Sequence, residues 1–252
     1  MLTNEQITKF DMVLQKVLTS EHRREGIGTL GERTLHLVLK EYFEPNRACH
    51  EQKVGRYVAD IKNETGITEI QTRGFAGLRR KLTEFSKSYP VNVVYPVSQT
   101  RHICWLDPNS GEVTERRKSP KRGHPWDILY ELYALRPIMP LTNVTFTLVF
   151  VDTDDFKLLC GWSSDRKRGS SRYERIPTAI YDIITLANPE DYSVLVPPEL
   201  GEKFTASEFA KSARMTKRTA GYAIQTLVTL GVIEHTETIG KAYVYKRKDL
   251  LI

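Results

Sequence analysis

Cysteine is scarce in this chain, long apolar runs are missing, and no internal repeat is visible. Three cysteines occur in 252 residues (Cys49, Cys104 and Cys160), and they lie far apart with no Cys-x-x-Cys spacing. We therefore expect neither a disulfide framework nor a structural zinc site, and a cytoplasmic location fits best. No segment approaches the roughly 18 apolar residues of a transmembrane helix. Because the first ten residues also lack the apolar core of a secretory signal, we expect neither a membrane nor a secreted protein.

The composition is that of a folded globular protein. Hydrophobic residues make up 40% of the chain and charged residues 27%, which is close to the globular average and excludes wholesale disorder. A length of 252 residues predicts one to two domains, each able to bury a core of its own.

The formal net charge of +6 is concentrated at the C-terminal end. Residues 203–252 contain nine Lys and Arg against four Asp and Glu, whereas the remaining chain holds 28 against 27. Such an asymmetry is typical of a module that binds a phosphate backbone. A solvated basic tail is the alternative, but the segment is more regularly patterned than a tail.

The pattern of this basic segment begins with a helix start. Thr205 and Glu208 have the spacing of a capping box, and Phe204 can pack against Phe209 as a hydrophobic staple. The helix should end near Ala213, followed by a short turn. These signals predict the first helix of a compact module.

A second helix and a hairpin should follow. Thr216 can cap the second helix, Gly231 suits its end, and residues 242–245 read as a strand after a turn through Gly240. Helix, turn, helix and hairpin together resemble a winged helix-turn-helix, in which the second helix enters the DNA groove and the wing reaches phosphates. Such modules also serve as protein contacts, and that alternative stays open. The resemblance implies nucleic-acid contacts at Arg214, Lys217, Arg218, Tyr222, Lys241 and Lys246.

The N-terminal body reads as alternating helices and strands. Amphipathic or β-branched patterns and turn signals predict a mixed α/β domain. The expected elements are helices at 4–20, 30–43 and 75–88, the last with a basic face, and strands at 54–61, 67–72, 91–97 and 102–106.

The hairpin formed by the first two strands carries the candidate chemistry. A two-residue loop at Glu64–Thr65 places Asp60 opposite Glu69, although a bulge at Gly66 would make the pair diagonal. Gln71 shares the face of Glu69 because strand side chains alternate. Facing carboxylates repel by about 0.2–1 kcal/mol, a cost that a bound divalent cation would offset. Oxygen ligands favour Mg²⁺.

Asp60 followed by Glu69-Ile70-Gln71, in a strand–turn–strand–helix context, resembles the PD-(D/E)XK nuclease superfamily. The resemblance implies that Asp60, Glu69 and the backbone carbonyl of Ile70 hold Mg²⁺ or Mn²⁺, and that the metal activates a water for phosphodiester hydrolysis. The sequence departs from the pattern at Gln71, where a lysine is usual. Glutamine can orient a water but brings no positive charge to the transition state.

Glu32 has two interpretations. The resemblance makes it the carboxylate that often assists from the preceding helix, and it shares a helix face with the apolar Leu35, Leu39 and Tyr42. Thr29 and Glu32 also have the spacing of a capping box, which is a purely structural role. Both interpretations stay open.

The middle of the chain holds two polar, basic stretches, at 115–123 and 165–175. They are either solvated loops or loops that grip a phosphate backbone. The second interpretation assigns nucleic-acid contacts to Arg116, Arg117, Lys121 and Arg122. Asp152, Asp154 and Asp155 follow a predicted strand at 143–151, and we interpret them as a solvated acidic turn rather than a metal site.

The sequence therefore predicts an α/β protein: a restriction-endonuclease-like mixed sheet flanked by helices at 1–198, in which 124–198 is a sheet extension or a subdomain, and a small winged-helix domain at 199–252. The expected function is metal-dependent endonuclease cleavage of double-stranded DNA. A non-catalytic DNA-binding regulator on the same scaffold is the alternative, favoured by Gln71. A winged helix that binds RNA or protein, and a homodimer, are left open.

Overall fold

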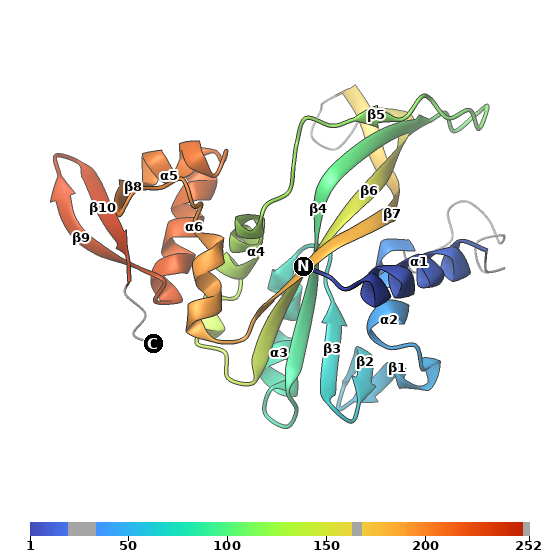
Figure 1. Ribbon diagram of the computed structural model, residues 1–252, viewed down its shortest axis with the longest axis horizontal. Coiled ribbons are helices and arrows are strands. Elements are labelled where there is room, and N and C mark those ends of the chain that lie inside the picture. The colour runs from blue at the N-terminus through green and yellow to red at the C-terminus, as the bar shows by residue number, and fades with distance from the viewer. Residues whose placement is uncertain (20–33, 163–167, 249–252) are drawn as a thin grey trace. The chain divides into compact units, whose positions relative to one another are not determined.

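The computed structural model describes residues 1–19, 34–162 and 168–248 (Figure 1). The chain forms an α/β protein with a mixed sheet flanked by helices and a small antiparallel sheet. It divides into two compact units, each assembled from three separate segments. The first unit contains 1–52, 96–123 and 149–183, and the second contains 53–95, 124–148 and 184–252. No helix within the described residues is long and apolar enough to span a membrane.

The helices are short, apart from the first and last. Two of them, α3 and α4, begin directly after turns of 3-10 helix at residues 75–78 and 125–127, and a further 3-10 turn at 136–138 follows α4. The α-helices are α1 (Asn4–Thr19), α2 (Thr34–Phe43), α3 (Arg79–Phe85), α4 (Ile128–Tyr133), α5 (Ala206–Ser212) and α6 (Lys217–Thr229).

The larger sheet is mixed. Its strand order is β1-β2-β3-β4-β6-β7, with β5 paired to β4, and β2–β3 is antiparallel while β3–β4 is parallel. The smaller sheet has the order β8-β10-β9 and is antiparallel. The strands are β1 (His50–Val54), β2 (Tyr57–Asn63), β3 (Gly66–Ile70), β4 (Val91–Leu106), β5 (Arg117–Lys118), β6 (Val144–Trp162), β7 (Arg168–Leu186), β8 (Lys203–Thr205), β9 (Ile233–Ile239) and β10 (Ala242–Arg247).

Four predicted elements differ clearly from the structure. The strand expected at 54–61 is interrupted, because Gly55 has a φ of 59° and turns the chain between β1 and β2. The strands expected at 91–97 and 102–106 form one continuous strand, β4. The helix expected at 75–88 begins as 3-10 helix and ends at Phe85.

In the first unit, α1 packs against α2. Phe10 of α1 is fully buried and meets the ring of Tyr42 edge to face at 5.9 Å. Leu35 and Leu39 are buried on the same face of α2 as Tyr42, as their helical spacing predicts. Burial of each large apolar side chain on this face contributes about 1.5–3 kcal/mol to stability.

In the second unit, the two terminal helices begin as predicted. Thr205 and Glu208 form a capping box at the start of α5, and the Thr216 side chain accepts from the Thr219 amide at the start of α6. Gly231 follows α6 with a φ of 74°, the left-handed conformation that ends a helix. These elements and strands β8–β10 are drawn in orange and red in Figure 1. The domain boundary that the sequence predicts between residues 198 and 199 stays a prediction.

Candidate active site

The hairpin of β2 and β3 has the register that the sequence predicts. Ile61 pairs with Thr68 and Asn63 with Gly66, so the two-residue loop is Glu64–Thr65 and no bulge intervenes. Gly66 has a φ of 132°, and a Cβ at this position would lie 2.3 Å from the carbonyl oxygen of Pro90. Only glycine fits this close approach of β3 to the chain that enters β4.

Asp60 and Glu69 come together where the backbone ladder of the hairpin ends. Beyond the pair Ile61–Thr68, side chains replace backbone groups as acceptors. The amide of Asp60 donates to Glu69 Oε1 at 3.3 Å, and the amide of Ile70 donates to Asp60 Oδ2 at 2.7 Å. The two carboxylates are therefore neighbours that each bind the opposite strand.

Lys81 is a third member of this site. The sequence predicts Lys81 on the basic face of the helix at 75–88 and assigns it no role; in the structure its Nζ lies 2.6 Å from Glu69 Oε2, and its side chain is only 22% exposed. Its ammonium also lies 5.8 Å from the centre of the Phe85 ring. The spacing of Leu78, Lys81 and Phe85 was the available signal, because residues three and four apart share a helix face and the other two are buried.

Glu69 is a buried carboxyl group in an unusual electrostatic setting. The residue is 1% exposed. Burial, followed by the nearby charge of Asp60, raises the pKa of Glu69 to about 7, while the charge and hydrogen bond of Lys81 act in the opposite direction. A carboxyl group that titrates near neutral pH beside a second carboxylate and an ammonium is typical of a functional site.

Ile70 is the last residue of β3, and Gln71 is the first residue after the strand. The N–H and C=O groups of one strand residue point to the same edge, so the carbonyl of Ile70 faces the side on which its amide binds Asp60. The amide of Gln71 points the other way and donates to Val94 O at 2.9 Å. The side-chain Nε2 of Gln71 donates to the carbonyl of Arg73 and not to either carboxylate.

The oxygen donors of this site suit a divalent cation only in part. Asp60, Glu69 and the Ile70 carbonyl offer oxygen atoms only, and Mg²⁺ is usually bound by one or two carboxylates together with waters and substrate phosphates. No group of three or more His, Cys, Asp or Glu side chains that could hold a metal occurs within residues 1–19, 34–162 and 168–248. Glu32 lies outside the described residues. The pair fits Mg²⁺ only in a site completed by water and substrate.

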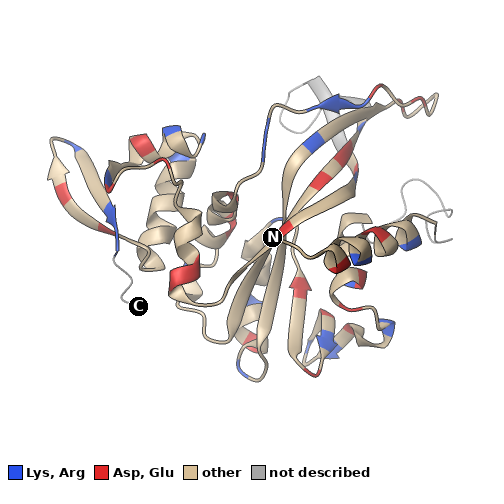
Figure 2. Ribbon diagram, in the orientation of Figure 1, with Lys and Arg blue, Asp and Glu red and all other residues tan. Residues whose placement is uncertain are grey.

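The predicted DNA-reading cations at the start of α6 are exposed. Lys217 and Arg218 occupy its first turn, Arg214 precedes it with a φ of 53°, and Lys241 lies in the turn between β9 and β10. Lys246 is instead held by Glu234, with 3.1 Å between Nζ and Oε1. Figure 2 shows the distribution of charged residues over these elements.

Tyr222, which the winged-helix resemblance places in a DNA groove, is engaged within the protein. Its ring stacks on that of Tyr133 in α4 at 4.4 Å, and its hydroxyl accepts from Arg218 Nε at 2.9 Å. This side of α6 therefore packs against α4.

The basic stretch at 115–123 is only partly a free loop. Arg117 lies on β5 and pairs with Ile103 of β4. Arg116 forms an ion pair with Asp154, with 2.8 Å between Nε and Oδ1. Lys121 and Arg122 are exposed, and Figure 2 shows Lys and Arg on β5 and on the chain that follows it.

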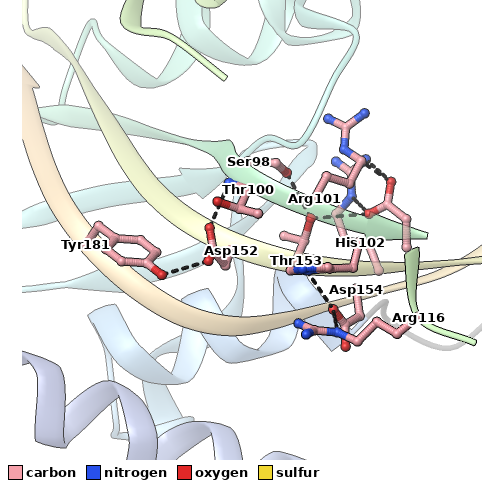
Figure 3. Close-up of polar contacts among 11 residues, drawn as sticks. Ser98, Thr100, Arg101, His102, Arg116, Asp152, Thr153, Asp154 and Tyr181 are labelled. Carbon is pink, nitrogen blue, oxygen red and sulfur yellow. Dashed lines mark hydrogen bonds and ion pairs between the residues drawn. The ribbon is translucent and has the colours of Figure 1, made fainter. Parts of the chain in front are cut away.

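The acidic residues at 152–155 do not form a solvated turn, because they lie within strand β6. Asp152 accepts from the Thr100 amide and from the Tyr181 hydroxyl, each at 2.7 Å (Figure 3). Asp155 is 2% exposed and receives two hydrogen bonds from Arg175, at 2.6 and 2.7 Å. These hydrogen bonds and ion pairs give the carboxylates a structural role.

A cleft of about 510 Å³ lies in the second unit, away from the carboxylate pair. His124 and Trp126 stack on its wall at 4.5 Å, and Arg214 is the one predicted nucleic-acid contact among its lining residues. It contains none of the predicted catalytic side chains. The other lining residues are Glu199, Leu200, Gly201, Lys203, Phe204, Glu208, Lys211 and Ser212.

Residues 33–187 match the model of a family described as a domain of unknown function, DUF8091, and the chain belongs to that family. A relative from Treponema pallidum (strain Nichols), with the name "Uncharacterized protein", is 27% identical over 229 residues, which cover 88% of each chain. No solved structure matches the chain. The family match includes Asp60, Glu69 and Lys81 and ends before β8.

Proposed function

We propose that this protein is a divalent-metal-dependent endonuclease of the PD-(D/E)XK type that acts on DNA. The observation that carries the proposal is the arrangement around Glu69: a buried carboxylate with Asp60 on one side and the Lys81 ammonium 2.6 Å away. Holding two carboxylates together in a buried place costs stability, and such a cost is usual where a site is built for function.

The proposed roles follow from the positions of the three side chains. Asp60, Glu69 and the Ile70 carbonyl would hold Mg²⁺ or Mn²⁺, which when bound polarises the phosphoryl oxygen and lowers the pKa of a water ligand. Lys81 supplies the positive charge that Gln71 lacks, and its ammonium can stabilise negative charge that develops on the phosphate. The superfamily pattern is then completed by a lysine from α3 rather than from the strand.

For DNA binding we propose the segment β8-α5-α6-β9-β10 as a winged helix. Arg214, Lys217 and Lys241 are exposed cations at the start of α6 and at the tip of the hairpin, where they would meet phosphates of a duplex. Each such contact adds to a salt-dependent affinity. Lys121 and Arg122 are further exposed cations for this purpose.

A non-catalytic DNA-binding regulator is the second candidate. It is favoured by the Gln71 side chain, which binds the Arg73 carbonyl instead of the carboxylates, and by Lys81, which already compensates Glu69 without a metal. If the protein is such a regulator, Asp60, Glu69 and Lys81 have only a structural role, in which the ion pair of Glu69 with Lys81 connects β3 to α3.

A cleavage assay separates the two candidates. Supercoiled plasmid and a labelled duplex are incubated with Mg²⁺ or Mn²⁺ and with the wild type, Asp60→Asn, Lys81→Met or Glu84→Gln. The last is a matched control, because Glu84 is an exposed carboxylate on α3 that pairs only with Lys87 among the ion pairs described. Nuclease function requires cleavage that both site variants reduce by at least about a hundredfold, the scale of one lost electrostatic contact, and that the control retains.

Metal binding and DNA binding are measured on the same proteins by calorimetry and anisotropy. No cleavage and no Mn²⁺ binding, together with intact duplex affinity, would select the regulator. Cleavage that survives Asp60→Asn and Lys81→Met would contradict the assigned site.

A further inference from the structure

Three tyrosines and two arginines gather where α4 meets α6. Tyr133 and Tyr222 stack with 4.4 Å between ring centroids and 29° between planes, and Tyr130 lies 6.2 Å from Tyr222 at 47°. Arg136 lies over the Tyr133 ring at 5.2 Å and Arg218 over the Tyr222 ring at 5.7 Å. We call these five residues the tyrosine–arginine cluster.

Both arginines of the cluster are held by neutral partners. Arg136 donates to Gln225 Oε1 at 2.7 Å and to Thr229 Oγ1 at 3.1 Å, and Arg218 donates to the Tyr222 hydroxyl at 2.9 Å. Within the described part of the chain, no carboxylate forms an ion pair with either guanidinium. The cluster therefore carries two positive charges that are fixed in position and that no acidic side chain neutralises.

The cluster is also open to solvent. Tyr130 is 53% exposed, and Arg218 is exposed as well. Tyr133 and Tyr222 are half-buried, so the exposed Tyr130 ring lies beside a stacked pair that is partly enclosed by the protein. Leu129 of α4 and Leu227 of α6 are fully buried, whereas Tyr130 is more than half exposed, so core packing does not account for this tyrosine.

We propose that the tyrosine–arginine cluster binds unpaired nucleotides of a single-stranded nucleic acid. A base would stack on the exposed face of Tyr130, and phosphates would lie against the guanidinium groups of Arg136 and Arg218. Proteins that bind single strands without sequence preference combine aromatic rings, on which bases stack, with positively charged side chains that bind the phosphates. The inference rests on the proposed function and refines its substrate to DNA with an unpaired region.

The engagement of Tyr222 favours a single strand over a duplex at this place. Its ring is covered by Tyr133 and its hydroxyl is bound by Arg218, so it is not free to enter a groove. The duplex contacts of the proposed winged helix, Lys217 and Lys241, are different side chains. Single-strand and duplex affinities should consequently respond to different substitutions.

Fluorescence anisotropy of the full chain tests the inference, with a labelled oligothymidylate and a duplex of equal length as probes. Stacking of one base contributes about 1–3 kcal/mol, so Tyr130→Ala should weaken oligothymidylate binding by about 5- to 150-fold. Tyr130→Phe keeps the ring and should retain the affinity. Lys217→Gln should weaken duplex binding and leave the oligothymidylate affinity unchanged.

The outcomes are distinguishable. Wild-type protein that binds the duplex but not oligothymidylate, or a Tyr130→Ala variant with wild-type affinity for oligothymidylate, overturns the inference and leaves the proposed function standing. Binding of neither probe overturns both. Because Tyr130 is exposed, the variant should fold normally, and an unchanged thermal transition is the check.

Discussion

Replacement of Glu69 by glutamine should stabilise the protein at alkaline pH while removing a residue of the proposed active site. In the folded protein Glu69 is 1% exposed and its pKa is raised to about 7 from an ordinary value of 4.5, through burial first and then the charge of Asp60. Glutamine has nearly the same shape and cannot ionise. The substitution therefore removes the electrostatic cost of Glu69 and leaves the packing of β3 in place.

The magnitude follows from proton linkage. A folded-state pKa that is raised means that the folded protein binds a proton which the unfolded chain releases, so the free energy of unfolding falls as pH rises from 4.5 to about 7. Each pKa unit corresponds to about 1.4 kcal/mol, which sets the cost at about 3 kcal/mol above pH 7. The attraction to Lys81 is already contained in this pKa, and glutamine resembles the protonated form of Glu69. We therefore expect Glu69→Gln to be more stable than the wild type by up to about 3 kcal/mol at alkaline pH.

Urea denaturation at a series of pH values provides the measurement. Wild type and Glu69→Gln should have nearly the same midpoint at acidic pH, where Glu69 is protonated in the folded state. The variant should become the more stable protein as the pH passes neutrality. Tryptophan fluorescence and circular dichroism would follow the transition.

Glu84→Gln is the matched control on α3. Its hydrogen bond with Lys87 lowers the pKa of Glu84, so this exposed carboxylate is ionised in both the folded and the unfolded state above about pH 6. In that range its loss should add no dependence on pH. A Glu69→Gln protein that is less stable than the wild type at alkaline pH would refute the reasoning. A difference that does not vary with pH would do the same.

Two further substitutions test structural contacts, one in each compact unit. Asp155→Asn should destabilise the protein by about 3 kcal/mol, because it leaves the Arg175 guanidinium, now bound at 2.6 and 2.7 Å, without its buried counter-charge; thermal denaturation measures this, and an unchanged transition would contradict a structural role. Gly66→Ala should destabilise by at least about 2 kcal/mol, because the new Cβ would meet the Pro90 carbonyl at 2.3 Å and the φ of 132° is unfavourable for alanine. Wild-type stability of Gly66→Ala in the same assay would show that the β3–β4 approach is not rigid.

The features that the sequence predicted well depend on near neighbours in the chain. The capping box of Thr205 and Glu208 spans four residues, and so does the turn between β2 and β3 at 63–66. The facing arrangement of Asp60 and Glu69 follows from that turn, because a two-residue loop fixes the register of both strands. Short-range signals therefore located the carboxylate pair of the candidate site.

The features that were missed depend on how separate elements dock. Lys81 reaches Glu69 only because α3 lies against β3, and a basic run in the sequence looks the same on a solvated helix face. Asp154 and Asp155 form ion pairs with arginines at positions 101, 116 and 175, which are distant in the sequence. The prediction of a solvated acidic turn therefore had no local signal of these partners. Periodicity within one segment carries no information on such partners.

The contact of α4 with α6 determines how the chain can be divided. The Thr226 hydroxyl of α6 is fully buried and donates to the Leu129 carbonyl of α4 at 3.4 Å, and Arg136 binds Gln225 and Thr229. The family match includes α4 but ends at residue 187, before α6. A fragment trimmed to the matched region would expose the apolar side of α4 to water, and a foreign C-terminal module grafted after it would not cover that side. The smallest fragment that keeps the native fold must therefore extend through α6. A chimaera of two relatives has to take α4 and α6 from the same protein.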